Sequence, residues 1–339
     1  MLLVIFGAGA SYDSNPRRPP MEYGGLEFRP PLANELFDDR PFMSAMINSF
    51  ERCQPVIPYL YKREGFSVER ELQSLQEQAS NNPVRHKQLA AVRYYLHAML
   101  WDCMNHWVSE ARGVTNYKTL LDQITHWRSP DEKVCLVTFN YDTMLEQALP
   151  SIGIQINTIN DYIDHPKFQL IKVHGSIDWG RQANVIIENI DQKNDWAVAK
   201  ELIEKADNLS LHPGYQIVKT RPIGKVGSTP FFPAIAIPLE RKSEYECPAE
   251  HLNALNEFLP GVTKILVIGW SATEEHFLRL LPSIQMKNYV RVLTVAGSPE
   301  TANEVNQRIN HHIGGIFENA KSGFTQFVVT REAEKFLRS

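Results

Sequence analysis

Three short polar segments of this 339-residue chain contain the side chains best suited to chemistry. They are residues 7–11 (GAGAS), 140–142 (NYD) and 174–176 (HGS). Glycines let the phosphates of a ligand approach the main chain. An asparagine amide can orient a water or a sugar hydroxyl, and a neutral histidine can accept a proton near pH 7. Together the segments fit a site that binds a phosphate-containing ligand and activates water.

The glycine-rich segment 7–11 has two interpretations. Gly7, Ala8, Gly9 and Ser11 can bind a pyrophosphate, or the segment can be only a tight turn between a strand and a helix. It is not a P-loop, because no Gly-Lys-Ser/Thr follows it, and it lacks the third glycine of the dehydrogenase fingerprint. The acidic residue expected at the end of a second strand is also missing. A dinucleotide ligand fits the segment, whereas hydride transfer is not supported.

The other two segments also have structural interpretations. Asn140 can cap a loop, Asp142 can be the N-cap of a helix over 143–149, and His174 can be a satisfied structural residue at a strand end. In the functional interpretation, Asn140 orients water or a ribose hydroxyl and His174 acts as the general base.

The elements that position these segments are predicted from apolar runs that end in small or polar residues. The runs are nearly continuous rather than alternating, which is typical of strands buried on both faces of a parallel sheet. Helical stretches lie between several of them, at 143–149 and 274–281. The pattern predicts an α/β fold with a Rossmann-like open parallel sheet of about six strands. The runs cover residues 2–6, 134–139, 168–173, 264–269 and 290–295.

Two further strand ends add candidate ligand contacts, because ligands bind beyond the carboxyl ends of the strands in such sheets. Gly269 and Ser271 follow the run at 264–269, and Gly297 and Ser298 follow the next run. As turns at strand ends, these residues are expected to line the adenosine side of a dinucleotide.

Two insertions interrupt the sheet pattern of what we expect to be one catalytic domain over 1–339. The first, about 41–128, is helical, with apolar residues at helical spacing from Leu89 to Met104. The second, about 182–229, is polar, contains a helix near 195–206 and is interpreted as a lid or a flexible edge.

Composition narrows the class of protein. The net charge is −4, so direct binding of nucleic acid is not expected. The four cysteines are far apart and form no CxxC pair, so no structural zinc site is expected, and Cys135 is predicted to be a small core residue. No signal peptide and no membrane-spanning run is recognised, so we expect a cytoplasmic protein.

The order of these motifs resembles the sirtuin family. The segments GAGAS, TFNYD (138–142), KVHGSIDW (172–179) and ILVIGWS (265–271) follow one another as in sirtuins, and they are most similar to the sirtuin-like NAD hydrolases of bacterial anti-phage defence. PPLANELF (30–37) and FPAIAIP (232–238) also resemble that branch. The four-cysteine zinc module of deacetylase sirtuins is missing, and their GIPDFR segment is not present as such.

The resemblance implies that NAD is a substrate, that no metal is needed, and that the nicotinamide–ribose bond is hydrolysed. It places His174 against the nicotinamide ribose, where it takes a proton, and Asp142 either at the nicotinamide or only as a helix cap. A regulatory module that binds NAD or ADP-ribose, or an ADP-ribosyltransferase, is the alternative. The family also suggests abortive infection, a homo-oligomer, and a sensor partner such as a HerA-type ATPase, a short Argonaute or a nucleotide-sensing protein.

Overall fold

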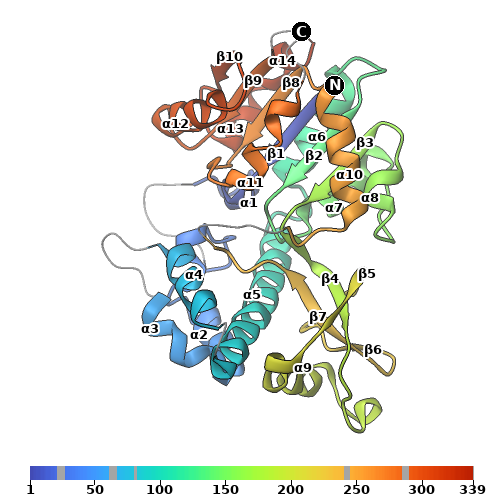
Figure 1. Ribbon diagram of the computed structural model, residues 1–339. Coiled ribbons are helices and arrows are strands. Elements are labelled where there is room, and N and C mark those ends of the chain that lie inside the picture. The colour runs from blue at the N-terminus through green and yellow to red at the C-terminus, as the bar shows by residue number, and fades with distance from the viewer. Residues whose placement is uncertain (21–26, 61–66, 80–81, 240–244, 285–289, 339) are drawn as a thin grey trace. The chain divides into compact units, whose positions relative to one another are not determined.

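A computed structural model describes the chain except for residues 21–26, 61–66, 80–81, 240–244, 285–289 and 339. The chain divides into two compact units. The first consists of Met1–Gly24, His106–His174 and Ser243–Ser339, and the second consists of Gly25–Asn105 and Gly175–Lys242. Figure 1 labels the elements of both units.

The first unit is built on a six-stranded sheet in which every neighbouring pair is parallel. The strands are β1 (Leu2–Phe6), β2 (Val134–Thr138), β3 (Phe168–Lys172), β8 (Lys264–Ile268), β9 (Val290–Val295) and β10 (Gly315–Asn319). This confirms the predicted α/β class and the five predicted runs; β10 was not predicted. The strand order is β10-β9-β8-β1-β2-β3. It is a doubly wound Rossmann order with its switch point between β1 and β8, since the chain builds outwards from β1 first on one side and then on the other.

Mostly short helices connect the strands of the first unit. They are α1 (Ala8–Tyr12), α6 (Asn116–Trp127), α7 (Met144–Ala148), α8 (Asp161–Asp164), α10 (Ala249–Phe258), α11 (Glu275–Leu278), α12 (Pro299–Asn310), α13 (Phe324–Val329) and α14 (Ala333–Arg338). The predicted helix at 143–149 is α7. The one predicted at 274–281 is shorter than expected, since α11 ends at Leu278 before a 3₁₀ turn.

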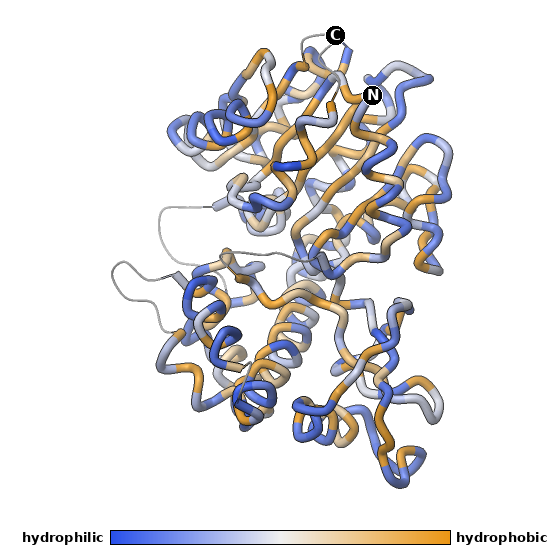
Figure 2. The backbone as a smooth tube through the Cα atoms, viewed as in Figure 1, coloured by the Kyte–Doolittle hydropathy of each residue, from blue (hydrophilic) through white to orange (hydrophobic). Residues whose placement is uncertain are grey.

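Burial on both faces explains why the runs are continuously apolar. All residues of β1, β2 and β8 are buried. Alternate residues of the central strands, such as Leu3 and Val137, join one hydrophobic cluster with residues of α10, α11 and α12. On the opposite alternation, Phe6 packs against Tyr117 of α6 with ring centroids 5.3 Å apart. Figure 2 shows the apolar character of these strands.

The second unit combines helices with a small antiparallel sheet. Its elements are α2 (Pro41–Ser49), α3 (Ile57–Leu60), α4 (Val68–Ala79), α9 (Asp195–Glu204), β4 (Gly175–Ala183), β5 (Leu211–Ile217), β6 (Lys225–Val226) and β7 (Thr229–Ile235). The sheet order is β5-β4-β7-β6. The segment predicted as the second insertion, about 182–229, contains α9, β5 and β6, while most of β4 and β7 lies outside it. The long helix α5 (Pro83–Glu110) also begins here, and its predicted apolar face is confirmed, since Leu89, Leu96 and Met104 are all buried.

The four cysteines are free and buried, and Cys135 lies in the core of β2 as expected. Over the described part of the chain, no helix combines the length and apolarity needed to span a bilayer.

Candidate functional site at the strand ends

The carboxyl ends of β1, β2 and β3 bring the three polar segments to one edge of the sheet. Residues 7–11 follow β1, and Asn140 and His174 each lie two positions after the last residue of β2 and of β3. Because β1 pairs with β2 and β2 with β3 in parallel register, these three strand ends are neighbours. The end of β8, with Gly269, lies on the other side of β1.

The Asn140 carboxamide is held by hydrogen bonds to the glycine-rich segment. Its Nδ2 donates to the Gly7 carbonyl oxygen at 2.9 Å and to Ser11 Oγ at 2.9 Å, and it lies 3.2 Å from the Tyr117 hydroxyl. Asn140 is 8% exposed. These contacts fix the rotation of the carboxamide, so its Oδ1 is the atom left to accept a hydrogen bond from a ligand or a water.

Ser11 connects Asn140 with Asp142. Ser11 Oγ donates to Asp142 Oδ2 at 2.6 Å, so the Tyr117 hydroxyl, 2.9 Å from Ser11 Oγ, is the donor of that second contact. Asp142 Oδ1 accepts from the Met144 amide at 3.0 Å. Asp142 thus makes a cap-like bond near the start of α7, although the N-cap position itself belongs to Thr143.

Tyr117 was not predicted as a site residue. It lies in α6, inside the segment that the sequence assigned to the first insertion, and no short motif surrounds it. Burial raises the pKa of its phenol well above the usual range, and the nearby Asp142 carboxylate adds to this effect. Tyr117 therefore stays protonated and donates its hydrogen bond at every pH used in an assay.

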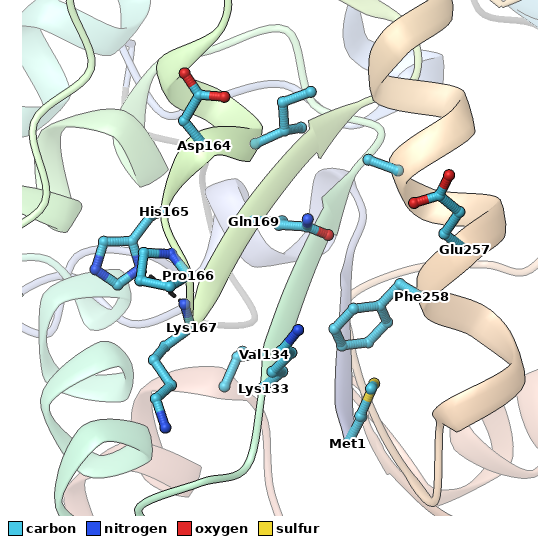
Figure 3. A pocket seen from close by; sticks show the side chains of 12 residues that line it. Met1, Lys133, Val134, Asp164, His165, Pro166, Lys167, Gln169, Glu257 and Phe258 are labelled. Atoms are coloured by element: carbon cyan, nitrogen blue, oxygen red, sulfur yellow. Dashed lines mark hydrogen bonds between the residues drawn. The ribbon is translucent and has the colours of Figure 1, made fainter.

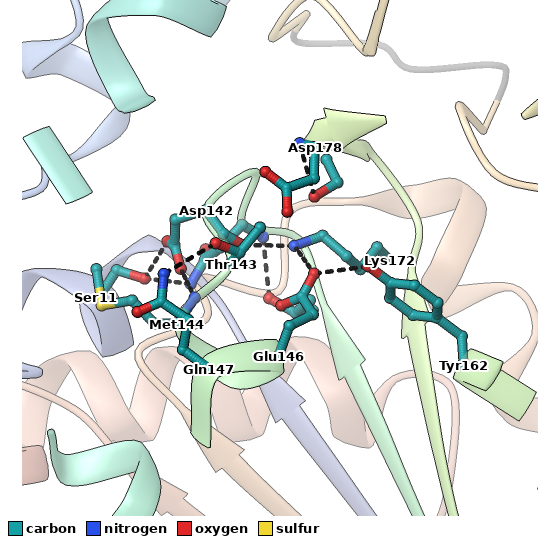
Figure 4. Close-up of polar contacts among 12 residues, drawn as sticks. Ser11, Asp142, Thr143, Met144, Glu146, Gln147, Tyr162, Lys172 and Asp178 are labelled. Atoms are coloured by element: carbon teal, nitrogen blue, oxygen red, sulfur yellow. Dashed lines mark hydrogen bonds and ion pairs between the residues drawn. The ribbon is translucent and has the colours of Figure 1, made fainter. Parts of the chain in front are cut away.

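A buried ion pair between Lys172 and Glu146 contacts the turn at Asp142. Lys172, the last residue of β3, donates to the Asp142 carbonyl oxygen and lies 3.0 Å from Glu146 Oε1. Figure 4 shows these residues together with Tyr162, whose hydroxyl donates to the same Glu146 oxygen at 3.0 Å.

His174 lies in an aromatic environment and is only 2% exposed. Its ring is 5.1 Å from that of Phe139 in an edge-to-face arrangement, and 5.9 Å from that of His276 in a stacked arrangement. Phe139 in turn stacks on Trp270, with centroids 5.1 Å apart and planes inclined by 5°. Trp270 and His276 were not predicted as site residues. Trp270 lies within the ILVIGWS segment, and His276 lies on α11 outside any recognised motif.

The glycines after β1 are explained by close packing against the end of β8. A Cβ on Gly7 would lie 2.5 Å from Trp270 Cα, and one on Gly9 would lie 2.9 Å from Gly269 Cα. Gly269 has a positive φ of 59°, and its carbonyl accepts the Gly9 amide at 3.0 Å. Ala8, half-buried at the start of α1, has an amide that bonds to no carbonyl among the described residues, so it is the group of this loop open to a ligand.

The remaining predicted contacts lie on exposed turns. Ser271 Oγ pairs with Thr273 Oγ1 at 2.9 Å. Ser298 is the N-cap of α12 and accepts from the Thr301 amide at 3.2 Å, and Gly297 is exposed with open space on its Cβ side. These turns follow β8 and β9. They are not part of the hydrogen-bond network that joins Asn140, Ser11 and Asp142.

A pocket of about 270 Å³ lies at the other end of the sheet. It is lined by residues around the amino ends of β2 and β3, including Lys133, His165 and Gln169 (Figure 3). Ligands of doubly wound sheets bind at the carboxyl ends of the strands, so we do not assign this pocket to the chemistry of Asn140 and His174. Within the described ranges, no group of three or more His, Cys, Asp or Glu residues is arranged to hold a metal ion.

Comparison with known proteins shows a similarity to Sir2 proteins. A family model described as SIR2-like domain matches residues 134–211. A search of curated proteins gives no match. Among solved structures, the chain is similar to a mutant Sir2 homologue in complex with 2'-O-acetyl ADP ribose, at 13% identity and a TM-score of 0.44 over 100% of this chain and 93% of the other. It is also similar to Sir2Tm bound to a propionylated peptide (12% identity, TM-score 0.36, 100% and 94% covered) and to a Sir2–p53 peptide–NAD+ structure (13%, 0.36, 100% and 94%). The segment that matches the SIR2-like model, residues 134–211, contains both Asn140 and His174 and is sirtuin-like.

Proposed function

We propose that this chain is an NAD glycohydrolase. In the proposed reaction, the bond between the nicotinamide nitrogen and C1' of the ribose breaks, and a water oxygen bonds to C1'. The products are nicotinamide, ADP-ribose and one proton. Positive charge develops on the ribose ring, as in glycoside hydrolysis, but nicotinamide leaves as a neutral molecule and needs no general acid.

The observation that carries the proposal is the position of Asn140 and His174 after the adjacent strands β2 and β3, on the β1 side of the switch point of a doubly wound sheet. That switch point, between β1 and β8, is where dinucleotides bind in this architecture. The match of residues 134–211 to a SIR2-like domain supports the same assignment, because the matched segment includes both residues.

Each residue has a task in this proposal. Asn140 uses Oδ1 to orient the attacking water or a ribose hydroxyl, since its Nδ2 is committed to Gly7 and Ser11. His174 accepts the proton that the water or hydroxyl releases. The aromatic rings around His174 exclude bulk water, which favours attack by one positioned molecule.

The glycine-rich segment contributes to NAD binding in a narrower way than the sequence suggested. The packing of Gly7 and Gly9 against β8 accounts for these two glycines, which leaves the Ala8 amide as the proposed contact to the pyrophosphate. Gly269, Ser271, Gly297 and Ser298 remain proposed contacts on the adenosine side.

We extend the proposal to the cell on the strength of the motif resemblance alone. The chain would then deplete NAD in the cytoplasm of a bacterium as part of anti-phage defence. It would act as a homo-oligomer or with a separate sensor protein, since continuous hydrolysis would exhaust the cell's own NAD.

The test is release of nicotinamide from NAD by the purified full chain, followed by chromatography, without any acyl-lysine peptide. Formation of nicotinamide and ADP-ribose in equal amounts supports the hydrolase. Release that requires an acetyl-lysine peptide would overturn it in favour of a deacylase, and attachment of ADP-ribose to an added protein would favour a transferase. Binding of ADP-ribose without any turnover, by the chain alone and together with its sensor protein, would identify a regulatory module.

A further inference from the structure

Lys172 is a buried charged residue near the candidate site, and the proposed reaction gives it no task. Its side chain is fully buried at the end of β3, and its ammonium pairs with Glu146, whose side chain is 10% exposed. Tyr162 of α8 donates to Glu146 Oε1 at 3.0 Å, so the carboxylate is itself held in place. Buried ion pairs rarely add stability over well-packed apolar residues, so stability alone does not account for this one.

The third partner of Lys172 is the main chain of the turn that follows Asn140. The ammonium donates to the Asp142 carbonyl oxygen. The same residue, through Oδ2, accepts from Ser11, and Ser11 accepts from the Asn140 carboxamide. The chain of contacts therefore runs from the ion pair through Asp142 and Ser11 to Asn140, as Figure 4 shows for its first members.

We propose that Lys172 is a positioning residue for the proposed hydrolase site: the Lys172–Glu146 pair holds the 140–142 turn so that Asn140 and Asp142 keep their orientation. An apolar side chain at position 172 could fill the same space but could not donate to the Asp142 carbonyl. The expected effect of Lys172 on turnover rests on the proposed function. Its effect on the conformation of the 140–142 turn does not, because the contacts that hold this turn belong to the fold.

The chain contains a matched control at the opposite end of the same sheet. Lys264, at the start of β8, pairs with Glu132 at 3.0 Å, and both side chains are 8% exposed. Its ammonium also donates to a main-chain carbonyl, that of Leu337, at 2.9 Å. The chemistry is the same as that of Lys172, but the contacts lead away from Asn140.

The experiment compares two double variants, Lys172→Met/Glu146→Gln and Lys264→Met/Glu132→Gln. Each removes both charges of its lysine–glutamate pair, and the amide oxygen introduced at position 146 can still accept from Tyr162. In the control, the N-terminal ammonium of Met1, 4.0 Å from Glu132, also loses its carboxylate partner, and the thermal midpoint reports the cost of that loss. Two quantities are measured for each variant at equal folded concentration: turnover of NAD with its KM, and hydrogen–deuterium exchange of the amides in 140–144. The thermal midpoint reports the fold.

For Lys172→Met/Glu146→Gln we expect kcat at least 10-fold below wild type, KM within 3-fold, and exchange at least 10-fold faster at the Met144 amide, which donates to Asp142 Oδ1. The Lys264→Met/Glu132→Gln control should change neither kcat nor exchange in this turn. Equal behaviour of the two variants in both measurements, at similar thermal midpoints, would overturn the proposal. If the wild type alone releases no nicotinamide, there is no turnover to compare, and the exchange comparison decides whether Lys172 holds the turn. If the double variant at Lys172 does not fold, the milder variant Tyr162→Phe decides: it removes only the hydrogen bond that holds Glu146 Oε1, and unchanged exchange at the Met144 amide in this variant would overturn the proposal.

Discussion

Replacing Asn140 by alanine separates its catalytic role from its structural one. The carboxamide makes two hydrogen bonds of 2.9 Å inside the protein, to the Gly7 carbonyl and to Ser11 Oγ. At a net value of about 1 kcal/mol for each buried hydrogen bond, Asn140→Ala should lower the free energy of unfolding by about 2 kcal/mol. The side chain is therefore expected to contribute to stability as well as to chemistry.

The expected loss of turnover is much larger than this loss of stability can explain. A domain with about 5 kcal/mol of stability would retain about 3 kcal/mol, which leaves less than about 1% of the molecules unfolded. If Asn140 orients the attacking water or the ribose, misplacement should lower kcat by about 100-fold. The assay is nicotinamide release at about 25 °C, with urea unfolding of the same preparations.

Tyr117→Phe is the matched comparison for Asn140→Ala. It removes the hydroxyl that contacts Ser11 Oγ at 2.9 Å but leaves the Asn140 carboxamide and its bond to Gly7 in place. We expect a similar loss of stability and a loss of turnover below about 10-fold. Full turnover in Asn140→Ala, together with the predicted loss of stability, would show that Asn140 is only a structural residue and would refute its role.

Individual contacts lead to three further predictions. His174→Gln should lower turnover by about 10²–10⁴-fold while the affinity for ADP-ribose stays within a few-fold, measured by calorimetry; unchanged turnover would remove His174 as the general base. Burial lowers the pKa of His97 from 6.5 to about 4, so the unfolded state binds a proton at higher pH than the folded state and stability falls as the pH drops from 6.5 towards 4. Urea unfolding should lose about 2 kcal/mol between about pH 7.5 and about pH 5 from this group, and His97→Gln should remove that part of the pH dependence; an identical dependence in both proteins would contradict it. Gly9→Val should lower the thermal midpoint, because its Cβ would lie 2.9 Å from Gly269 Cα, whereas Ala8→Val should weaken ADP-ribose binding with little change in the midpoint.

The parts of the fold that could be predicted from the sequence are those in which one physical requirement dominates. The runs that form β1, β2 and β8 are buried on both faces, so their apolar character is continuous and their bounds are clear. The edge strand β10 has no such requirement. Ile316 is 50% exposed and Glu318 pairs with Arg291, so its residues do not form an apolar run.

Residues of the candidate site escaped prediction when their role depends on contacts distant in sequence. Tyr117 is 106 positions from Ser11, and in the sequence it is one aromatic residue of an amphipathic helix. Lys172 is the first residue of the KVHGSIDW segment, but only its burial and its bond to the Asp142 carbonyl distinguish it from a lysine at a solvated strand end. Neither feature has a local sequence signal.

The two glycines of the GAGAS loop have a packing role in the structure, and ligand binding by this loop stays a prediction. Gly7 and Gly9 are required by the approach of β8, because any side chain there would meet the main chain of 269–270. This close packing has a consequence for the site, since it draws the end of β8 against the end of β1 at the switch point of the sheet. The glycines thus shape the site by letting the two strand ends approach each other. In the proposed function, the chemistry is carried out by the side chains of Asn140 and His174, which follow β2 and β3. The double variant Asn140→Ala/His174→Gln keeps both glycines, so the first unit should still fold while nicotinamide release is lost. A thermal midpoint that collapses together with turnover would instead show that the two side chains act mainly on the fold.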